Sequence, residues 1–150
     1  MLIDEKAKKQ IFEEYNIFKN SQYANKSLEE RKELDQYFTP PAAAIKMIEC
    51  FNCDSLENKI ILDPCCGSGN LLAACILAGA NPENVYGNEL DKTMLELCRK
   101  RLADLCEKYG LKNIPNKNLH QGDALNYRCL RPESFTDDYK YITYEQESLW

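Results

Sequence analysis

The sequence predicts an α/β fold in which helices flank a parallel β-sheet. Two apolar segments of strand type carry this prediction: residues 59–62 run directly into Asp63, and residues 85–89 end at Glu89. Each is followed by a predicted helix: residues 70–78 are apolar almost all round, which suits a buried helix, and residues 91–109 have one apolar face at helical spacing. Strands that alternate with helices over short links are typical of a parallel sheet wound through right-handed crossovers.

A helical arm is predicted to precede this sheet, over residues 1–35. Its first helix has an apolar stripe at helical spacing, formed by Ile11, Phe12, Tyr15 and Phe18. The pattern Ser27-x-x-Glu30 is typical of a capping box and predicts a second, short helix. We expect the arm to serve packing or docking, and the domain proper to span residues 36–150.

The remaining elements follow in order. Residues 42–50 are predicted to form a helix after Thr39-Pro40-Pro41, because proline suits a first helical turn. Gly79 and Gly110 are expected to end the two later helices. Residues 118–121 predict a weaker third strand, and residues 139–144 could add another. Because a half-sheet exposes an unpaired strand edge, we expect a dimer, a protein partner or closure by residues 139–144.

Length, charge and hydropathy limit the classes of function that this sequence allows. A chain of 150 residues that is 44% hydrophobic predicts one compact domain, with or without a mobile arm. The net charge of −5 makes it a poor candidate for gripping a DNA duplex unaided, because such surfaces are normally basic. No apolar run reaches the length of about 18 residues that a membrane span needs, and residues 1–9 do not resemble a signal peptide. We therefore expect a cytoplasmic protein without membrane contact.

Eight cysteines allow three interpretations. Disulfides would require a secreted chain, and no secretory signal is present. A zinc site could use Cys50-x-x-Cys53, but a second clean pair is missing and His120 is the only histidine. The favoured interpretation is reduced thiols that lie mostly in the core, where cysteine behaves as a small hydrophobe. No metal is predicted.

Chemistry is expected at the carboxyl ends of the strands, where parallel sheets bind ligands. These ends present Asp63 with a glycine loop, then Glu89, then Asp123. Gly67 and Gly69 allow a close backbone approach, and the helix that follows offers free amide groups to an anion. A carboxylate about 20 residues after the loop is placed to accept ribose hydroxyls, and a third acid can accept from an adenine amine. Taken singly, each feature has a purely structural alternative: the glycine loop could be a tight turn, Glu89 a helix-capping acid and Asp123 a turn former.

The spacing of the glycines narrows the class of ligand. A dinucleotide-binding loop needs a third glycine where this sequence has Leu72, and no phosphate-binding Gly-Lys-Ser or Gly-Lys-Thr is present. The loop therefore suits a nucleoside with a small anionic group, such as an amino-acid carboxylate.

These segments resemble the motifs of adenine-N6 DNA methyltransferases of restriction–modification systems. Asp63-Pro64-x-Cys66-Gly67-Ser68-Gly69 is similar to motif I, and Gln36-Tyr37-Phe38-Thr39-Pro40 to motif X. Residues 86–91 resemble motif II and residues 121–124 motif III. Guanine-N2 ribosomal RNA methyltransferases share motif I, but motif X at this position favours the adenine-N6 group. The resemblance implies a Rossmann-like class I methyltransferase half-domain that binds S-adenosylmethionine.

The resemblance also implies roles for individual residues. Phe38 and Thr39 would contact the methionine moiety. Asp63 and the Gly67-Ser68-Gly69 backbone would hold its amino and carboxylate groups, with Pro64 and Cys65 in the same loop. Glu89 would bind the ribose hydroxyls and Leu90 would lie against the adenine ring. Asp123 would accept from the adenine amine, with Ala124 beside the ring.

One departure limits what the resemblance implies. The family holds its target amine with Asn-Pro-Pro-Tyr or Asn-Pro-Pro-Phe after a fourth strand and stacks the aromatic ring on a flipped-out base. This sequence has neither motif, and residues 141–145 read Tyr-Ile-Thr-Tyr-Glu at the expected place. We therefore expect a cofactor-binding part that does not transfer methyl groups alone and that meets DNA through a missing region or a partner subunit.

Three alternatives remain open at this stage. The chain could be a catalytically inactive protein that binds S-adenosylmethionine as a sensor, decoy or partner subunit. It could methylate RNA or another nucleic-acid amine. The least favoured alternative is a zinc-stabilised interaction module.

Overall fold

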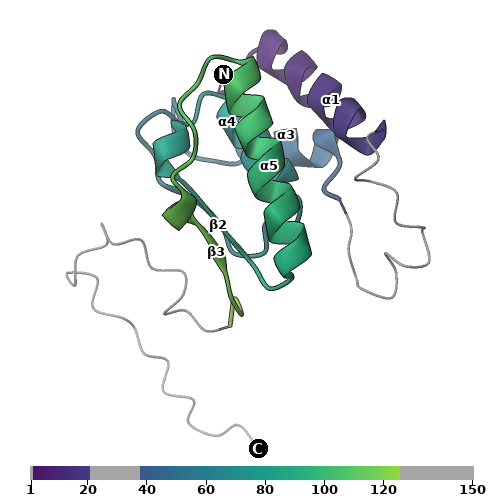
Figure 1. Ribbon diagram of the computed structural model, residues 1–150. Coiled ribbons are helices and arrows are strands. Elements are labelled where there is room, and N and C mark those ends of the chain that lie inside the picture. Colours follow the sequence, from purple (N-terminus) through teal and green to yellow (C-terminus); the bar gives the residue numbers. More distant parts are fainter. Residues whose placement is uncertain (1, 21–37, 126–150) are drawn as a thin grey trace, which may run out of the picture.

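A computed structural model describes residues 2–20 and 38–125 of the chain (Figure 1). Helices and parallel strands alternate through the described residues, which confirms the predicted fold class. The elements are α1 (Glu5–Asn20), α3 (Pro41–Glu49), β1 (Ile61–Asp63), α4 (Asn70–Leu77), η2 (Pro82–Asn84), β2 (Val85–Glu89), α5 (Lys92–Lys108), η3 (Asn116–Asn118) and β3 (Leu119–Gln121). The helix predicted near residue 27 and the strand predicted at residues 139–144 lie outside the described residues.

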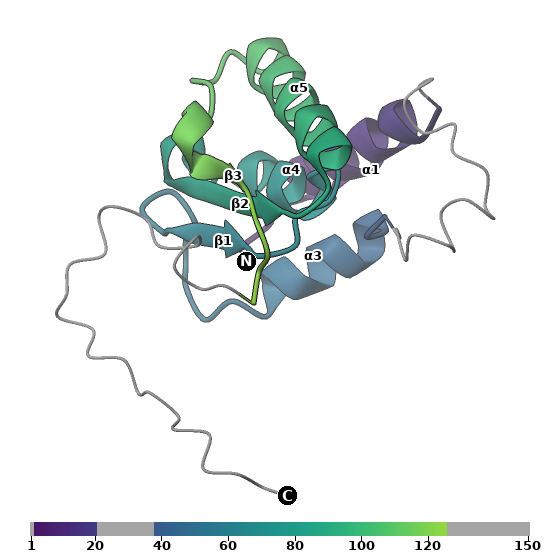
Figure 2. The same cartoon turned by 60° about the horizontal axis from the view of Figure 1, so that its bottom comes forward.

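The three strands form one parallel sheet in the order β1-β2-β3, side by side in Figure 2. Ile61 pairs with Val85, and Gly87 pairs with Leu119. This register brings the carboxyl ends of all three strands to the same edge of the sheet, as the sequence predicts.

Helices α4 and α5 pack on the face of the sheet that carries Val85, Gly87 and Leu119. A Cβ atom at Gly87 would lie only 2.9 Å from Cδ1 of Leu72, so glycine is what lets α4 approach the sheet this closely. Val85 and Leu119 are buried in the same core cluster. On the opposite face, Leu62 is 42% exposed.

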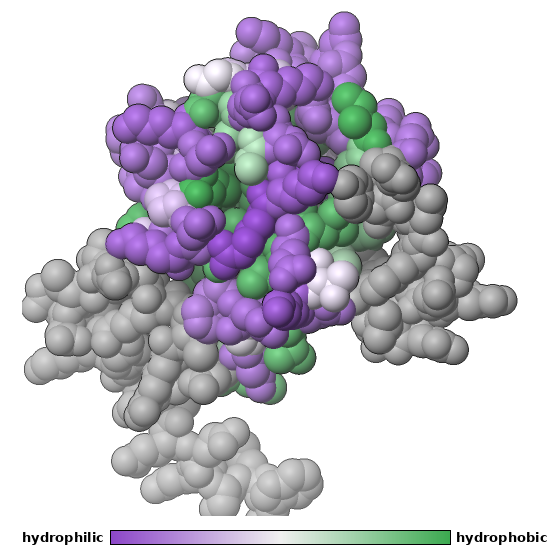
Figure 3. All heavy atoms as spheres, in the orientation of Figure 1, coloured by the Kyte–Doolittle hydropathy of each residue, from purple (hydrophilic) through white to green (hydrophobic). Residues whose placement is uncertain are grey.

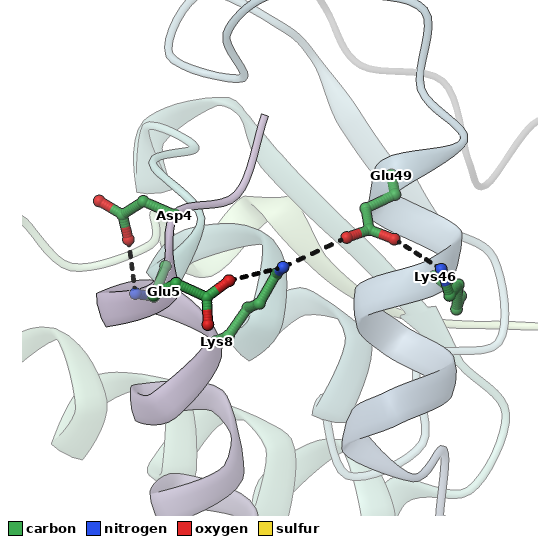
Figure 4. Close-up of polar contacts among 6 residues, drawn as sticks. Asp4, Glu5, Lys8, Lys46 and Glu49 are labelled. Carbon is green, nitrogen blue, oxygen red and sulfur yellow. Dashed lines mark hydrogen bonds and ion pairs between the residues drawn. The ribbon is translucent and has the colours of Figure 1, made fainter. Parts of the chain in front are cut away.

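Helix α1 is packed against this unit. Ile3, Ala7 and Ile11 are buried members of the core cluster, and α1 contacts both α3 and α4. Figure 4 shows Lys8 between Glu5 and Glu49 of α3. Lys8 Nζ lies 3.0 Å from Glu5 Oε1 and 3.7 Å from Glu49 Oε1. Residues 2–20 therefore contribute to the core; the predicted boundary after residue 35 falls outside the described residues and stays a prediction.

The apolar stripe predicted on α1 is only partly correct. Ile11 and Phe18 are buried, but Phe12 is 45% exposed and Tyr15 is half-buried. The buried face follows Ala7, Ile11 and Phe18, spaced four and seven residues apart, which a stripe drawn through the largest side chains misses.

The ends of α4 and α5 lie within one residue of the predicted bounds, 70–78 and 91–109. Gly69, in a left-handed conformation with φ of 80°, precedes α4, and Gly79 (φ 97°) follows it. The Asp91 carboxylate caps α5 by accepting from Thr93 N at 2.7 Å and Met94 N at 3.2 Å. Gly69 and Asp91 therefore fix where α4 and α5 start relative to β1 and β2. The functional site described below lies between these strand ends and helix starts.

The cysteines in the described ranges are free thiols, and four of them are buried: Cys66, Cys75, Cys98 and Cys106. Burial raises the pKa of the Cys75 thiol to about 12, so it stays protonated at neutral pH. Cys50 is exposed and Cys53 half-buried, and no group of three or more His, Cys, Asp or Glu residues within the described ranges is arranged to hold a metal. The core-thiol interpretation fits the buried cysteines; Cys129 lies outside the described residues.

The face of the molecule drawn in Figure 3 is largely hydrophilic, with apolar residues showing between the hydrophilic ones. Among residues 2–20 and 38–125, no helix combines the length and apolar character that crossing a membrane requires.

Candidate functional site

A cavity of about 410 Å³ opens at the carboxyl ends of β1 and β2. Its volume falls in the range of small-molecule sites, about 300–1,000 Å³. Both strand-end acids, the glycine loop and the first turns of α4 and α5 contribute to it. The lining residues are Phe38, Thr39, Asp63, Cys65, Cys66, Gly67, Ser68, Asn70, Leu71, Glu89, Leu90, Asp91 and Met94.

Glu89 is held at the rim of the cavity by backbone amides on either side. Its Oε2 accepts from Gly67 N at 2.8 Å, and its Oε1 accepts from Asp91 N at 3.0 Å. Each carboxylate oxygen can accept more than one hydrogen bond, so the fixed carboxylate can still receive two ligand hydroxyls.

Asp63 is half-buried, and its environment disfavours the charged form. Burial raises the pKa of its carboxyl group, the Cys65 N–H that donates to Oδ1 at 3.1 Å lowers it, and the nearby charge of Glu89 raises it. The net effect is a raised pKa. A cationic ligand group beside Asp63 would stabilise its ionised form.

Asn88 joins the segments that follow the three strands. Its side chain is 1% exposed, and Nδ2 donates to Pro64 O at 3.1 Å and to Gly122 O at 2.8 Å. The Asn88 carbonyl accepts from Cys66 N at 2.9 Å. This residue therefore sets the spacing of the strand ends. The sequence interpretation missed it; the signal is a polar residue between Gly87 and Glu89 in an otherwise buried strand.

Two buried donors at the start of α4 are left without partners. Ser68 is 2% exposed and Asn70 is 8% exposed, and both line the cavity. Among the described residues, neither Ser68 Oγ nor Asn70 Nδ2 has a hydrogen-bond partner. A buried polar group without a partner costs free energy, so this corner of the cavity suits a ligand with hydrogen-bond acceptors, such as a carboxylate.

The structure brings most of the predicted site residues together. Eight line the cavity: Phe38, Thr39, Asp63, Cys65, Gly67, Ser68, Glu89 and Leu90. Pro64 and Gly69 lie in the same loop but do not line it. Five further lining residues were not among the predicted site residues: Cys66, Asn70, Leu71, Asp91 and Met94. Three of them, Asn70, Leu71 and Met94, belong to first turns of helices, which point back toward the strand ends.

The described residues that follow β3 do not line the cavity, unlike those at the ends of β1 and β2. Gly122 N donates to the Glu89 carbonyl at 3.1 Å, so this segment starts beside the crevice. Asp123, however, is exposed, its Oδ1 accepts from Leu125 N at 2.9 Å, and neither Asp123 nor Ala124 lines the cavity. Their role toward a ligand stays a prediction.

Comparison with known proteins identifies the family. The family model described as N-6 DNA methylase matches residues 9–135. The Type II methyltransferase M.VspI of Vibrio sp. (strain 343) is 32% identical over 90 residues, which cover 60% of this chain and 20% of that protein. No solved structure gives a significant match. Because the family match spans most of the sequence and includes every residue that lines the cavity, the chain belongs to the N-6 DNA methylase family.

Proposed function

We propose that the cavity binds S-adenosylmethionine as the cofactor for methylation of adenine N6 in DNA. The observation that carries the proposal is that one cavity is lined by the strand-end acids Asp63 and Glu89 and by Ser68 and Asn70, whose buried donors have no partner among the described residues. S-adenosylmethionine has the complementary groups, namely ribose hydroxyls and an ammonium for the acids and a carboxylate for the donors. Family membership supports the same cofactor.

The residues divide the ligand between them in this proposal. Glu89 accepts from the ribose hydroxyls and Asp63 pairs with the amino group. Ser68 and Asn70 donate to the carboxylate. Leu90, which is 67% exposed, gains burial against the adenine ring. Phe38 and Thr39 close the methionine side.

When bound, S-adenosylmethionine supplies an electrophilic methyl group on its sulfonium sulfur. The residues of this cavity bind and orient the cofactor. The charge of Asp63 is better tolerated once an ammonium lies beside it, so binding favours the ionised carboxylate. Cys66 stays a neutral thiol, because its contact with Cys98 and its burial raise its pKa.

Recognition of the target amine is assigned outside these 150 residues. The sequence has no Asn-Pro-Pro-Tyr or Asn-Pro-Pro-Phe, and the aligned region covers a fifth of the Vibrio methyltransferase. We therefore propose that this function is supplied elsewhere in the protein or by a second subunit. The alternative is a methyltransferase-like protein that binds the cofactor without catalysis. Transfer of labelled methyl groups to unmethylated DNA by this chain alone would contradict both.

Calorimetric titration with S-adenosylmethionine and S-adenosylhomocysteine tests cofactor binding directly. Glu89→Ala should weaken both ligands about ten- to a hundredfold, because a charged acceptor for two hydroxyls is lost. Glu83→Ala is the matched control, since Glu83 is exposed at the amino end of β2, 3.2 Å from Lys112. Unchanged affinity in a folded Glu89→Ala protein would remove Glu89 from the site, and absence of wild-type binding would end the proposal.

A further inference from the structure

Arg101 extends from α5 toward the loop before α4. Its Nη1 donates to the Ser68 carbonyl at 3.2 Å and, in a short contact, to Asn70 Oδ1. On its other side the guanidinium lies over the Phe18 ring, 4.0 Å from the centroid. Building on the proposed function, we infer that Arg101 is a positioning residue that makes the crevice selective for ligands bearing a carboxylate.

Arg101 determines the orientation of the Asn70 amide. A guanidinium can only donate hydrogen bonds, so the group that faces Arg101 must be the amide oxygen. The amide nitrogen is therefore turned away from Arg101. Asn70 lines the cavity, and its Nδ2 is one of the two buried donors without a partner in the described part of the chain. Arg101 thus fixes Asn70 as a donor.

Arg101 also binds the backbone of Ser68, because it donates to the Ser68 carbonyl. Ser68 lines the cavity, and among the described residues its buried hydroxyl has no hydrogen-bond partner. One guanidinium therefore binds both residues that carry these donors, Asn70 through its side chain and Ser68 through its backbone. Donors on two residues at a helix N-terminus are complementary to a carboxylate, and they form no hydrogen bond with a ligand that lacks an acceptor there.

Arg101 is itself charged and anchored beside the cavity. Burial lowers the pKa of the guanidinium to about 10, so it remains charged at neutral pH. A ligand anion in the adjacent cavity would offset part of the cost of that buried charge. Phe18 stacks on Arg101 and also makes an edge-to-face contact with Phe38, at a centroid distance of 5.4 Å. Phe38 lines the cavity, so α1 supports the same corner.

The test compares two ligands that differ only in the carboxylate: S-adenosylhomocysteine and its decarboxylated analogue, which keeps the amine. Arg101→Lys retains a charge but loses the planar fork and the stack on Phe18. We expect it to weaken S-adenosylhomocysteine about tenfold and the decarboxylated analogue less than about twofold. Arg99→Lys is the matched control. Arg99 lies on the same helix and donates to the carbonyls of Asn116 and Leu119, and its substitution should leave the ratio of the two affinities unchanged.

A second variant keeps the inference testable if Arg101→Lys folds poorly. Asn70→Asp still accepts from Arg101 but replaces the donor by a carboxylate oxygen. It should weaken S-adenosylhomocysteine more than about tenfold and spare the decarboxylated analogue. Equal losses for both ligands in both folded variants would overturn the role of Arg101 while leaving cofactor binding intact. Failure of the wild type to bind either ligand would instead overturn the proposed function and the inference with it.

Discussion

Two buried asparagines lie at opposite ends of β2 and use the same chemistry. Asn88, at the carboxyl end, donates to the carbonyls of Pro64 and Gly122. Asn118 reaches the amino end, where its Nδ2 donates to Glu83 O at 2.9 Å and to Val85 O at 3.1 Å. Both side chains are almost completely buried, and each ties neighbouring segments together with two hydrogen bonds.

The ends of β2 differ in their charged groups. At the amino end, Glu83 has its counter-charge in Lys112. At the carboxyl end, Asp63 and Glu89 face a cavity together, and the pKa of Asp63 is raised. Asparagine side chains therefore hold both ends of β2 with the same kind of hydrogen bond. The carboxyl end differs because the carboxylates of Asp63 and Glu89 face a cavity, and this makes it the end suited to a ligand.

The largest effect is expected where the carboxyl end is packed most tightly. Gly69 has a φ of 80°, and an added Cβ would lie 2.8 Å from Cys98 Sγ. Gly67 also has a positive φ, of 53°, but nothing lies within 4 Å of its Cβ position. Gly69→Ala should therefore lower the free energy of unfolding by about 2–5 kcal/mol, and Gly67→Ala by about 1–2 kcal/mol. Urea unfolding measures both; equal losses would show that the loop can shift away from α5.

The next prediction tests the comparison of the asparagines directly. Asn88→Ala and Asn118→Ala should each lower the free energy of unfolding by about 2–4 kcal/mol, because two buried carbonyls lose their donor. Only Asn88→Ala should weaken S-adenosylhomocysteine, since only Asn88 sets the spacing of the loops around the cavity. Chemical unfolding followed by titration at a temperature where both variants are folded separates the two effects. Equal losses of affinity would mean that the two ends are coupled through the sheet.

Local pattern was enough to predict the strands, the helices and the residues of the glycine loop. Residues 85–89 and 92–108 form the expected elements because a short strand-type run that ends in an acid, and an apolar helix face, can each be recognised from consecutive residues. The supporting contacts were not predictable in this way. Arg101 meets Asn70 across 31 positions and Asn88 meets Gly122 across 34, and no local periodicity encodes which side chains meet over such separations.

The role of Asp63 predicts opposite effects of pH on stability and binding. Because its folded pKa is raised, Asp63 stabilises the ligand-free fold at low pH, and this contribution is lost as pH rises through the folded pKa. Asp63→Asn should therefore be more stable than wild type at neutral pH, and the difference should vanish in acid. The same variant should bind S-adenosylhomocysteine about tenfold more weakly at neutral pH. Wild-type affinity should fall as Asp63 becomes protonated, whereas Asp63→Asn should show no such step.

The smallest effect is expected at the end of β3. The Asp123 carboxylate is exposed and already accepts from Leu125 N, so a bond to an adenine amine would compete with solvent. Asp123→Ala should weaken S-adenosylhomocysteine by about two- to fivefold, the range of about 0.5–1 kcal/mol for an exposed hydrogen bond. Titration of both variants with S-adenosylhomocysteine compares this loss of affinity with that of Glu89→Ala. A loss as large as that of Glu89→Ala would mean that the β3 end closes on the ligand, because the ends of β1 and β2 line the cavity in this structure and Asp123 and Ala124 do not.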